Sequence, residues 1–163
     1  MKNKIMALAA ALMVFGVANT FALGIGVQGG LGVGSKTTGG PGLTLKLDQL
    51  PWVFAGNASF GDGLGIGVTA DMWLANPNLV AFLNGYFGWG VAGTVYLSDS
   101  KVSIGAGGRL LAGLNAKFFN DFLEAYLQIA WQPGATFNLA EGEDLIGANI
   151  FYIPANIGVR LWF

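Results

Sequence analysis

The hydrophobic positions of this chain recur with a period of two, most clearly in its last eight residues. One face of this segment is apolar, and the other carries a glycine, Gly158, and an arginine, Arg160. The apolar positions are Ile157, Val159, Leu161 and Phe163. A period of two is the side-chain period of a β-strand. The segment therefore predicts a strand whose two faces meet different environments.

The same alternation recurs along the chain and predicts eight strands in total. Short segments rich in Gly, Pro, Asn, Asp and Ser separate them, as is typical of turns. The predicted strands are 23–34, 43–47, 52–60, 64–74, 82–97, 102–114, 117–131 and 150–163. We expect short turns at 48–51, 61–63, 75–79 and 98–101, a polar loop at 35–42, and the longest loop at 132–149.

Residues 117–131 fit two structures. As a strand, the segment places Leu127 and Ile129 opposite Glu124. As a helix, it has an apolar stripe that includes Phe118 and Phe122, with i, i+3, i+4 spacing. We favour the strand, because a bacterial barrel needs an even number of strands to close.

Composition indicates a membrane environment. Hydrophobic residues make up 53% of the chain and charged residues only 10%, whereas an average soluble domain is about 25% charged. Yet no stretch reaches the roughly 18 consecutive apolar residues of a transmembrane helix. The other structure that satisfies all backbone groups in lipid is a closed barrel. We therefore predict an all-β fold, an eight-stranded antiparallel up-and-down transmembrane β-barrel, with the strand 156–163 pairing with 23–34.

The first 22 residues have the features of a secretory signal peptide. Lys2 and Lys4 form a basic start, residues 5–18 are apolar, and Thr20-Phe21-Ala22 resembles a cleavage site. We expect residues 1–22 to be removed on export and residues 23–163 to form the barrel domain. The predicted location is the cell outer membrane.

Five charged residues lie opposite the apolar face of their strands. They are Lys46, Asp71, Arg109, Glu124 and Arg160. A charge on the lipid face at mid-membrane would cost about 2–4 kcal/mol, so we expect all five to point into the barrel. Lone buried charges are also costly, so the interior should be a paired network. A barrel of eight strands is just wide enough for its own side chains, and we expect it to be filled.

Several kinds of chemistry are disfavoured by the composition. There is no cysteine and no histidine, which removes the commonest general base and transition-metal ligands. Gly24, Gly26 and Gly29 match a dinucleotide fingerprint only as a bare pattern, without the strand and helix that it requires. The acidic run 141–144 lacks the ligand spacing of a calcium loop. With a net charge of −1, we expect no nucleic-acid binding, no cofactor, no metal and no enzymatic activity.

The chain resembles the small eight-stranded outer-membrane barrels of the OmpA/OmpX type. The resemblance rests on the signal peptide, the alternating strands over 23–163 and the terminal Ile157-x-Val159-x-Leu161-x-Phe163. It implies that these four residues act as an assembly signal read by the barrel assembly machinery, and that outer-membrane lipid surrounds the barrel. Proteins of this family have diverse roles, so the fold does not define the function.

Three functions remain open at this level. The favoured one is a non-enzymatic envelope protein that stabilises the membrane or presents surface loops. An adhesin would bind a surface ligand or host factor through loops 34–42 and 132–149. A soluble, periplasmic lipocalin-like barrel would carry a small hydrophobic ligand and would need apolar residues inside. A small-solute channel is disfavoured by the number of strands.

Overall fold

The computed structural model describes residues 22–163 except 36, 62, 99–100 and 140–144, so nearly all of the predicted signal peptide lies outside the described residues. The described chain forms antiparallel strands. They are β1 (Leu23–Val33), β2 (Thr37–Leu47), β3 (Trp52–Phe60), β4 (Leu64–Ala75), β5 (Asn78–Val80), β6 (Leu83–Ser98), β7 (Lys101–Phe118), β8 (Leu123–Trp131), β9 (Gly134–Asn138), β10 (Ile146–Asn149) and β11 (Ile153–Trp162). Within the described residues, no helix has the length and apolar character needed to cross a membrane.

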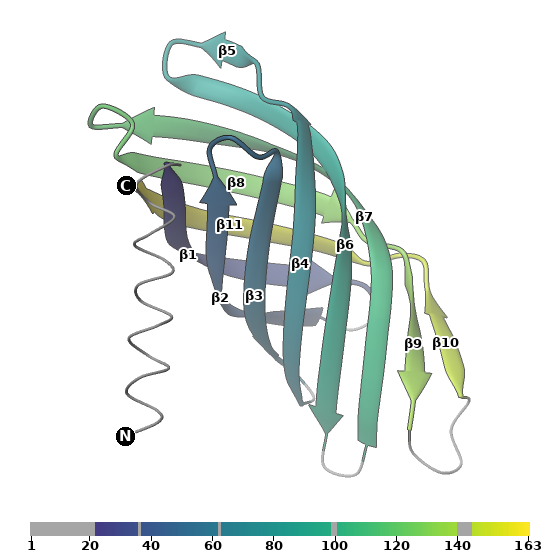
Figure 1. The fold of residues 1–163 in the computed structure, drawn as a ribbon. Coiled ribbons are helices and arrows are strands. Elements are labelled where there is room, and N and C mark those ends of the chain that lie inside the picture. The colour runs from purple at the N-terminus through teal and green to yellow at the C-terminus, as the bar shows by residue number, and fades with distance from the viewer. Residues whose placement is uncertain (1–21, 36, 62, 99–100, 140–144) are drawn as a thin grey trace, which may run out of the picture.

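Eight of these strands close into a barrel (Figure 1). Around the ring, β1, β2, β3, β4, β6, β7, β8 and β11 are neighbours, and β11 pairs back onto β1. The closing register runs from Gly24 opposite Trp162 to Val33 opposite Ile153. The predicted fold class and the predicted closing pair are both confirmed.

The two ends of the barrel differ in how far the strands extend and in which connections they contain. We call the end where β1 starts and β11 stops the terminal end; it also carries the β2–β3 and β7–β8 turns. The opposite end, which we call the distal end, carries the β1–β2, β3–β4, β6–β7 and β9–β10 connections. Figure 1 shows that β6, β7, β9 and β10 extend furthest at the distal end.

The predicted polar loop 35–42 is wrong, because β2 already begins at Thr37. Glycine and proline disfavour strands, which made residues 37–42 resemble a loop. These residues nevertheless pair with β1, from Val33 opposite Thr37 to Gln28 opposite Gly42. Pro41 lies where the assigned pairing of β2 with β3 is interrupted, so its missing N–H breaks no ladder bond.

The predicted loop 132–149 is also wrong over half of its length. Residues 134–138 and 146–149 form the hairpin β9–β10, and β9 continues the barrel wall by pairing with β7 from Ser103 to Gly107. The helical alternative for 117–131 is excluded as well. Strand β7 runs to Phe118, and β8 begins at Leu123 after a tight turn in which Phe119, Asn120 and Asp121 have positive φ angles.

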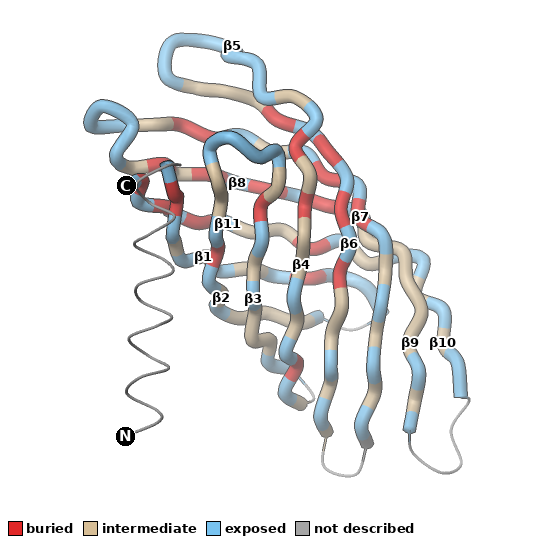
Figure 2. Tube along the Cα trace, viewed as in Figure 1, coloured by how far each residue is buried: buried red, intermediate tan, exposed pale blue. Residues whose placement is uncertain are grey.

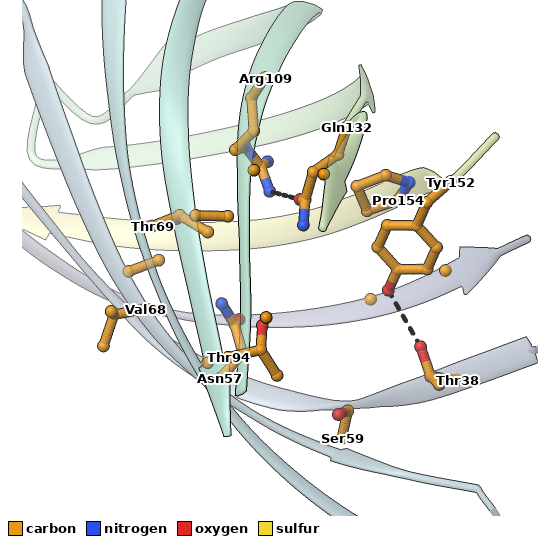
Figure 3. A pocket seen from close by; sticks show the side chains of 18 of the residues that line it. Thr38, Asn57, Ser59, Val68, Thr69, Thr94, Arg109, Gln132, Tyr152 and Pro154 are labelled. Atoms are coloured by element: carbon orange, nitrogen blue, oxygen red, sulfur yellow. Dashed lines mark hydrogen bonds between the residues drawn. The ribbon is translucent and has the colours of Figure 1, made fainter. Parts of the chain in front are cut away.

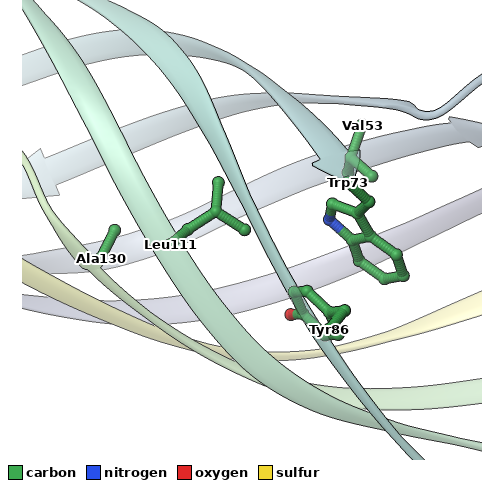
Figure 4. Packing of buried hydrophobic residues seen from close by; sticks show 5 residues of the cluster. All are labelled: Val53, Trp73, Tyr86, Leu111 and Ala130. Atoms are coloured by element: carbon green, nitrogen blue, oxygen red, sulfur yellow. The ribbon is translucent and has the colours of Figure 1, made fainter. Parts of the chain in front are cut away.

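Burial follows side-chain parity along every barrel strand (Figure 2). Outward apolar side chains are largely exposed, with 67% for Leu43, 63% for Val68 and 66% for Ile157. The hydrophobic cluster inside the barrel is small (Figure 4) and consists of Val53, Trp73, Tyr86, Leu111 and Ala130. Among the described residues, most large apolar side chains are therefore exposed, the opposite of a water-soluble fold.

Candidate functional site

The charged side chains of the strands lie in the barrel interior. Asp71, Arg109, Glu124 and Arg160 are all buried, and Lys46 is half-buried. Among the charged side chains that the structure describes within strands, none lies on the outward face. Polar chemistry is therefore concentrated in the interior, which we treat as the candidate site.

A buried ion pair anchors the terminal half of the interior. Arg160 on β11 lies directly across the ladder from Glu124 on β8, and its Nη1 is 3.1 Å from Glu124 Oε2. The side chains are 1% and 0% exposed. Glu124 also accepts hydrogen bonds from Asn115 Nδ2 at 2.9 Å and Trp162 Nε1 at 3.0 Å. A buried charge pair is tolerated when further hydrogen bonds satisfy its remaining atoms, and Glu124 meets that condition.

The lysines at this end contact aromatic rings. Lys46 Nζ lies 3.8 Å from the centroid of the Trp73 ring and 5.5 Å from that of Trp162. Lys117 Nζ lies 4.8 Å from the Trp162 ring, on which both lysines converge, and 3.8 Å from Asp121 Oδ2. Cations at such distances are attracted by the negative face of the ring. Lys46 therefore contacts aromatic faces, although we expected an ionic partner for it.

A chain of polar contacts crosses the middle of the barrel. Asp71 Oδ1 is 2.9 Å from Arg109 Nε, and Asp71 Oδ2 accepts a hydrogen bond of 3.0 Å from Gln128. Arg109 donates to Gln132 at 2.7 Å, and Tyr86 donates to Gln128 at 3.2 Å. These contacts join β4, β6, β7 and β8 across the lumen at this level.

Inward glycines allow these side chains to meet across an intervening strand. Asp71, Gly90 and Arg109 lie in one cross-strand row, and a Cβ at Gly90 would collide with Asp71 Oδ1. In the same way Arg160 reaches Thr44 at 3.1 Å over Gly26. Other polar pairs that meet over a glycine are Tyr126 and Gln28 over Gly158, Gln28 and Asn57 over Gly42, Tyr86 and Gln128 over Gly113, and Tyr152 and Thr38 near Gly32.

The distal half of the interior is hollow (Figure 3). A cavity of about 510 Å³ extends from Asp71 and Arg109 toward the distal end. Glycine, alanine, serine, threonine and asparagine supply much of its lining. Tyr152 and Thr38 form a hydrogen bond of 3.0 Å on one side of it. The expected filled lumen is thus observed in the terminal half and not in the distal half.

Of the five predicted interior charges, the structure brings four into two ion pairs and places Lys46 against tryptophans. The pairs themselves did not follow from the sequence, because strand register and shear were unknown. The sequence reasoning also missed the polar partners Thr44, Asn115, Tyr126 and Gln128. Parity places Tyr126 and Gln128 on the face of Glu124, but it does not show which side chains they contact.

The predicted assembly residues lie on the outer face of β11. Ile157, Val159, Leu161 and Phe163 are all exposed, and Phe163 exchanges two backbone hydrogen bonds of 3.1 Å with Leu23. The Phe163 ring also packs edge-on against Phe122. Recognition of these residues by an assembly machinery stays a prediction.

The chemistry of the interior is that of binding and stabilisation. Among the residues that the structure describes, no group of three or more acidic side chains is placed to hold a metal ion. The buried carboxylates are engaged with arginine and amide donors. The lipocalin-like alternative is disfavoured, because it needs a mainly apolar interior, and most large apolar side chains of the described residues lie outside.

A closed eight-stranded antiparallel barrel with an apolar exterior and a charged interior defines the class of small membrane β-barrels. The fold is similar to that of Neisserial surface protein A, with a TM-score of 0.51 and 13% sequence identity over 88% of this chain and 97% of that one. The N-terminal β-barrel domain of Pseudomonas aeruginosa OprF also aligns, with a TM-score of 0.47, 15% identity, and coverage of 86% and 97%. The first match confirms the resemblance to small outer-membrane barrels at the level of the fold. No protein-family model and no curated protein sequence matches the chain.

Proposed function

We propose that this protein is an integral outer-membrane β-barrel of a Gram-negative-type envelope, without enzymatic activity, that contributes to envelope structure or presents surface segments. One observation carries the proposal: the exterior is apolar around the barrel, and the charged side chains are inside. A soluble monomer rarely exposes an apolar patch larger than about 300–600 Å². Lipid is a favourable environment for such an exterior, whereas charged side chains on the outer face would be destabilising there.

Fractionation and gel migration test this proposal together. Expressed with residues 1–22 intact, the protein should be recovered with the outer membrane and should require detergent for extraction. The folded barrel should migrate differently from the boiled protein on a denaturing gel, because a closed barrel resists unfolding by detergent at room temperature. Recovery from the periplasm without detergent would contradict the membrane location.

A second candidate function is supported by the β9–β10 hairpin. The hairpin and the residues beside it expose several large apolar side chains, with 61% for Leu139, 67% for Leu145 and 78% for Phe151. At the distal end, β9 and β10 lie beside β7, one of the longest barrel strands (Figure 1). An apolar surface element of this kind suits an adhesin that binds a partner protein. The predicted loop 34–42 contributes little to such a surface, because most of it is strand β2.

Shortening the hairpin separates the two functions. In the test variant a two-residue Asn-Gly turn replaces residues 139–144, so that Asn138 stays opposite Leu145 and β9 and β10 keep their register. An adhesin variant should still insert into the outer membrane but should lose adhesion of whole cells to host-cell or matrix surfaces. Adhesion equal to that of the parent protein would exclude this hairpin as the binding surface.

A further inference from the structure

In the hollow distal half of the barrel, part of the polar lining has no hydrogen-bond partner among the described residues. The hydroxyls of Ser59, Thr69, Thr94 and Thr136 line the cavity, and none of them forms a hydrogen bond with another residue that the structure describes. They come from four different strands, β3, β4, β6 and β9, so they face the cavity from several sides. The terminal half differs, because its polar groups are largely paired with one another.

The charges at the floor of the cavity are already neutralised. Arg109 is paired with Asp71, and Arg160 with Glu124. Among the described lining residues, no charged side chain lacks an opposite partner. The cavity therefore has no built-in preference for an ion, and its specific contacts are hydroxyl and amide groups.

The size of the cavity suits a small organic molecule. Its 510 Å³ falls within the range of ligand pockets, roughly 300–1,000 Å³. At roughly 30 Å³ for each water, this volume corresponds to about 17 waters. A ligand with a similar number of non-hydrogen atoms would replace them, and it would need hydroxyl groups pointing in several directions to satisfy the walls.

We propose that the distal half of the barrel is a binding site for a neutral, polyhydroxylated molecule with the size of one or two sugar rings. The hydroxyls of Thr69, Thr94 and Thr136 would exchange hydrogen bonds with those of the ligand. The glycine and alanine surfaces between them would contact its C–H groups. The ion-paired floor at Asp71 and Arg109 would stop the ligand from passing through, so the site holds its ligand and does not conduct it.

One row of the barrel wall provides a sharp test. Thr94, Gly105 and Thr136 lie opposite one another on β6, β7 and β9. A Cβ at Gly105 would lie 3.9 Å from both Thr94 and Thr136 side chains, in ordinary contact without a clash. A leucine there would fill the cavity between the two hydroxyls. Gly108, on the same strand, faces outward and has no atom within 4 Å of an added Cβ, so Gly108→Leu is the matched control.

The experiment uses the folded barrel in lipid nanodiscs, free of sugar-headed detergent, with NMR signals of the threonine methyl groups as the readout. Glucose, N-acetylglucosamine and maltose are the neutral probes. Glucose 6-phosphate is the anionic probe, and cyclohexanemethanol has a similar ring with a single hydroxyl. We expect saturable shifts of the Thr94 and Thr136 signals with at least one neutral sugar, with a dissociation constant on the order of millimolar. Binding should be about tenfold weaker for cyclohexanemethanol, because most wall hydroxyls would stay unpaired.

The variants decide where the sugar binds. Gly105→Leu should abolish saturable binding, whereas Gly108→Leu should bind within about twofold of the parent protein, because it leaves the cavity unchanged. Thr94→Val and Thr136→Val keep the side-chain volume, and each should weaken binding by about two- to tenfold. These two variants carry the test if Gly105→Leu does not fold, which gel migration would reveal.

Four results would overturn the proposal. One is the absence of saturable shifts with every neutral sugar, which would leave the cavity as a water-filled space. A second is equal loss of binding in Gly105→Leu and Gly108→Leu. Tighter binding of glucose 6-phosphate would show an anion site, and tighter binding of cyclohexanemethanol would show an apolar one.

Discussion

The two halves of the barrel interior share most of their strands but contain different side chains. The terminal half contains long side chains such as Trp73, Tyr86, Tyr126 and Arg160, which meet near the barrel axis. The distal half contains short ones, mainly glycine, alanine, serine and threonine, which leave the cavity of about 510 Å³. The number of strands sets the width of a barrel, but side-chain length decides whether that width is filled. Four pairs of substitutions test this contrast and the assignment of inner and outer faces, in order of decreasing effect.

Glu124→Ala should cause the largest loss of stability. It removes three contacts to Glu124 and leaves the Arg160 charge buried without its partner, which typically costs about 3–5 kcal/mol. Thr94→Ala in the distal half should change the free energy of unfolding by less than about 1 kcal/mol, because this hydroxyl has no partner among the described residues. Urea unfolding in lipid vesicles measures both variants. Similar losses of unfolding free energy in the two variants would mean that the two halves of the interior contribute equally to stability.

Val68→Arg should impair insertion and stability more than Thr69→Arg, although the two residues are adjacent. Val68 faces outward and is 63% exposed, so an arginine there would meet lipid at a cost of about 2–4 kcal/mol. Thr69 lines the cavity, where an arginine finds space and polar neighbours. The yield of the heat-modifiable form and its urea midpoint measure the difference. Equal tolerance of the two substitutions would contradict the assignment of inner and outer faces.

Gly88→Leu should destabilise the barrel more than Gly105→Leu. An added Cβ at Gly88 would collide with the main-chain carbonyl of Met72, whereas at Gly105 it meets only ordinary contacts. Overpacking of a filled site costs about 1–3 kcal/mol, and a leucine in the cavity should cost less. Urea midpoints of the two variants make the comparison. A larger loss of stability for Gly105→Leu than for Gly88→Leu would show that the cavity has no room for a leucine side chain.

Phe163→Ala should have the smallest effect on stability and a separate effect on assembly. The Phe163 side chain is 62% exposed and packs edge-on against Phe122, a contact worth about 0.5–1.5 kcal/mol. If Phe163 is part of an assembly signal, folding in cells should slow while the urea midpoint of the folded fraction stays close to that of the parent. Phe119→Ala, which alters a residue 77% exposed at the same end, is the control. Equal assembly rates of the two variants would contradict a role of Phe163 in an assembly signal.

The period-two alternation of apolar and polar residues was enough to predict the barrel, because alternate side chains of each strand face lipid and lumen. Glu124 and Arg160 were placed inside by parity, and the structure pairs them because they lie directly opposite on β8 and β11. Asp71 and Arg109 could not be paired in advance, since a third strand lies between them and Gly90 leaves the space for their contact. The register describes how two strands are aligned, so it cannot be derived from the residue pattern of one strand alone.

Local composition misled where tertiary pairing overrode it. Residues 37–42 and 134–149 are rich in residues that disfavour strands, yet neighbouring strands complete their hydrogen bonding over much of both segments. The cavity was missed for a related reason. Glycines and short polar side chains were correctly placed inside, but the volume they leave depends on how many of them share one level of the barrel.

The side chains that reach across an intervening strand also bear on how the barrel closes. Arg160 contacts Thr44, and Tyr126 contacts Gln28, so residues of β11 and β8 are tied to β2 and β1. These ties cross the joint between the first and last barrel strands, which is the last pairing to become possible during folding. An unclosed sheet would hold Arg160 and Glu124 beside each other but without Thr44. Closure is therefore expected to be all-or-none, because the Arg160–Thr44 and Tyr126–Gln28 contacts form only when the first and last strands meet.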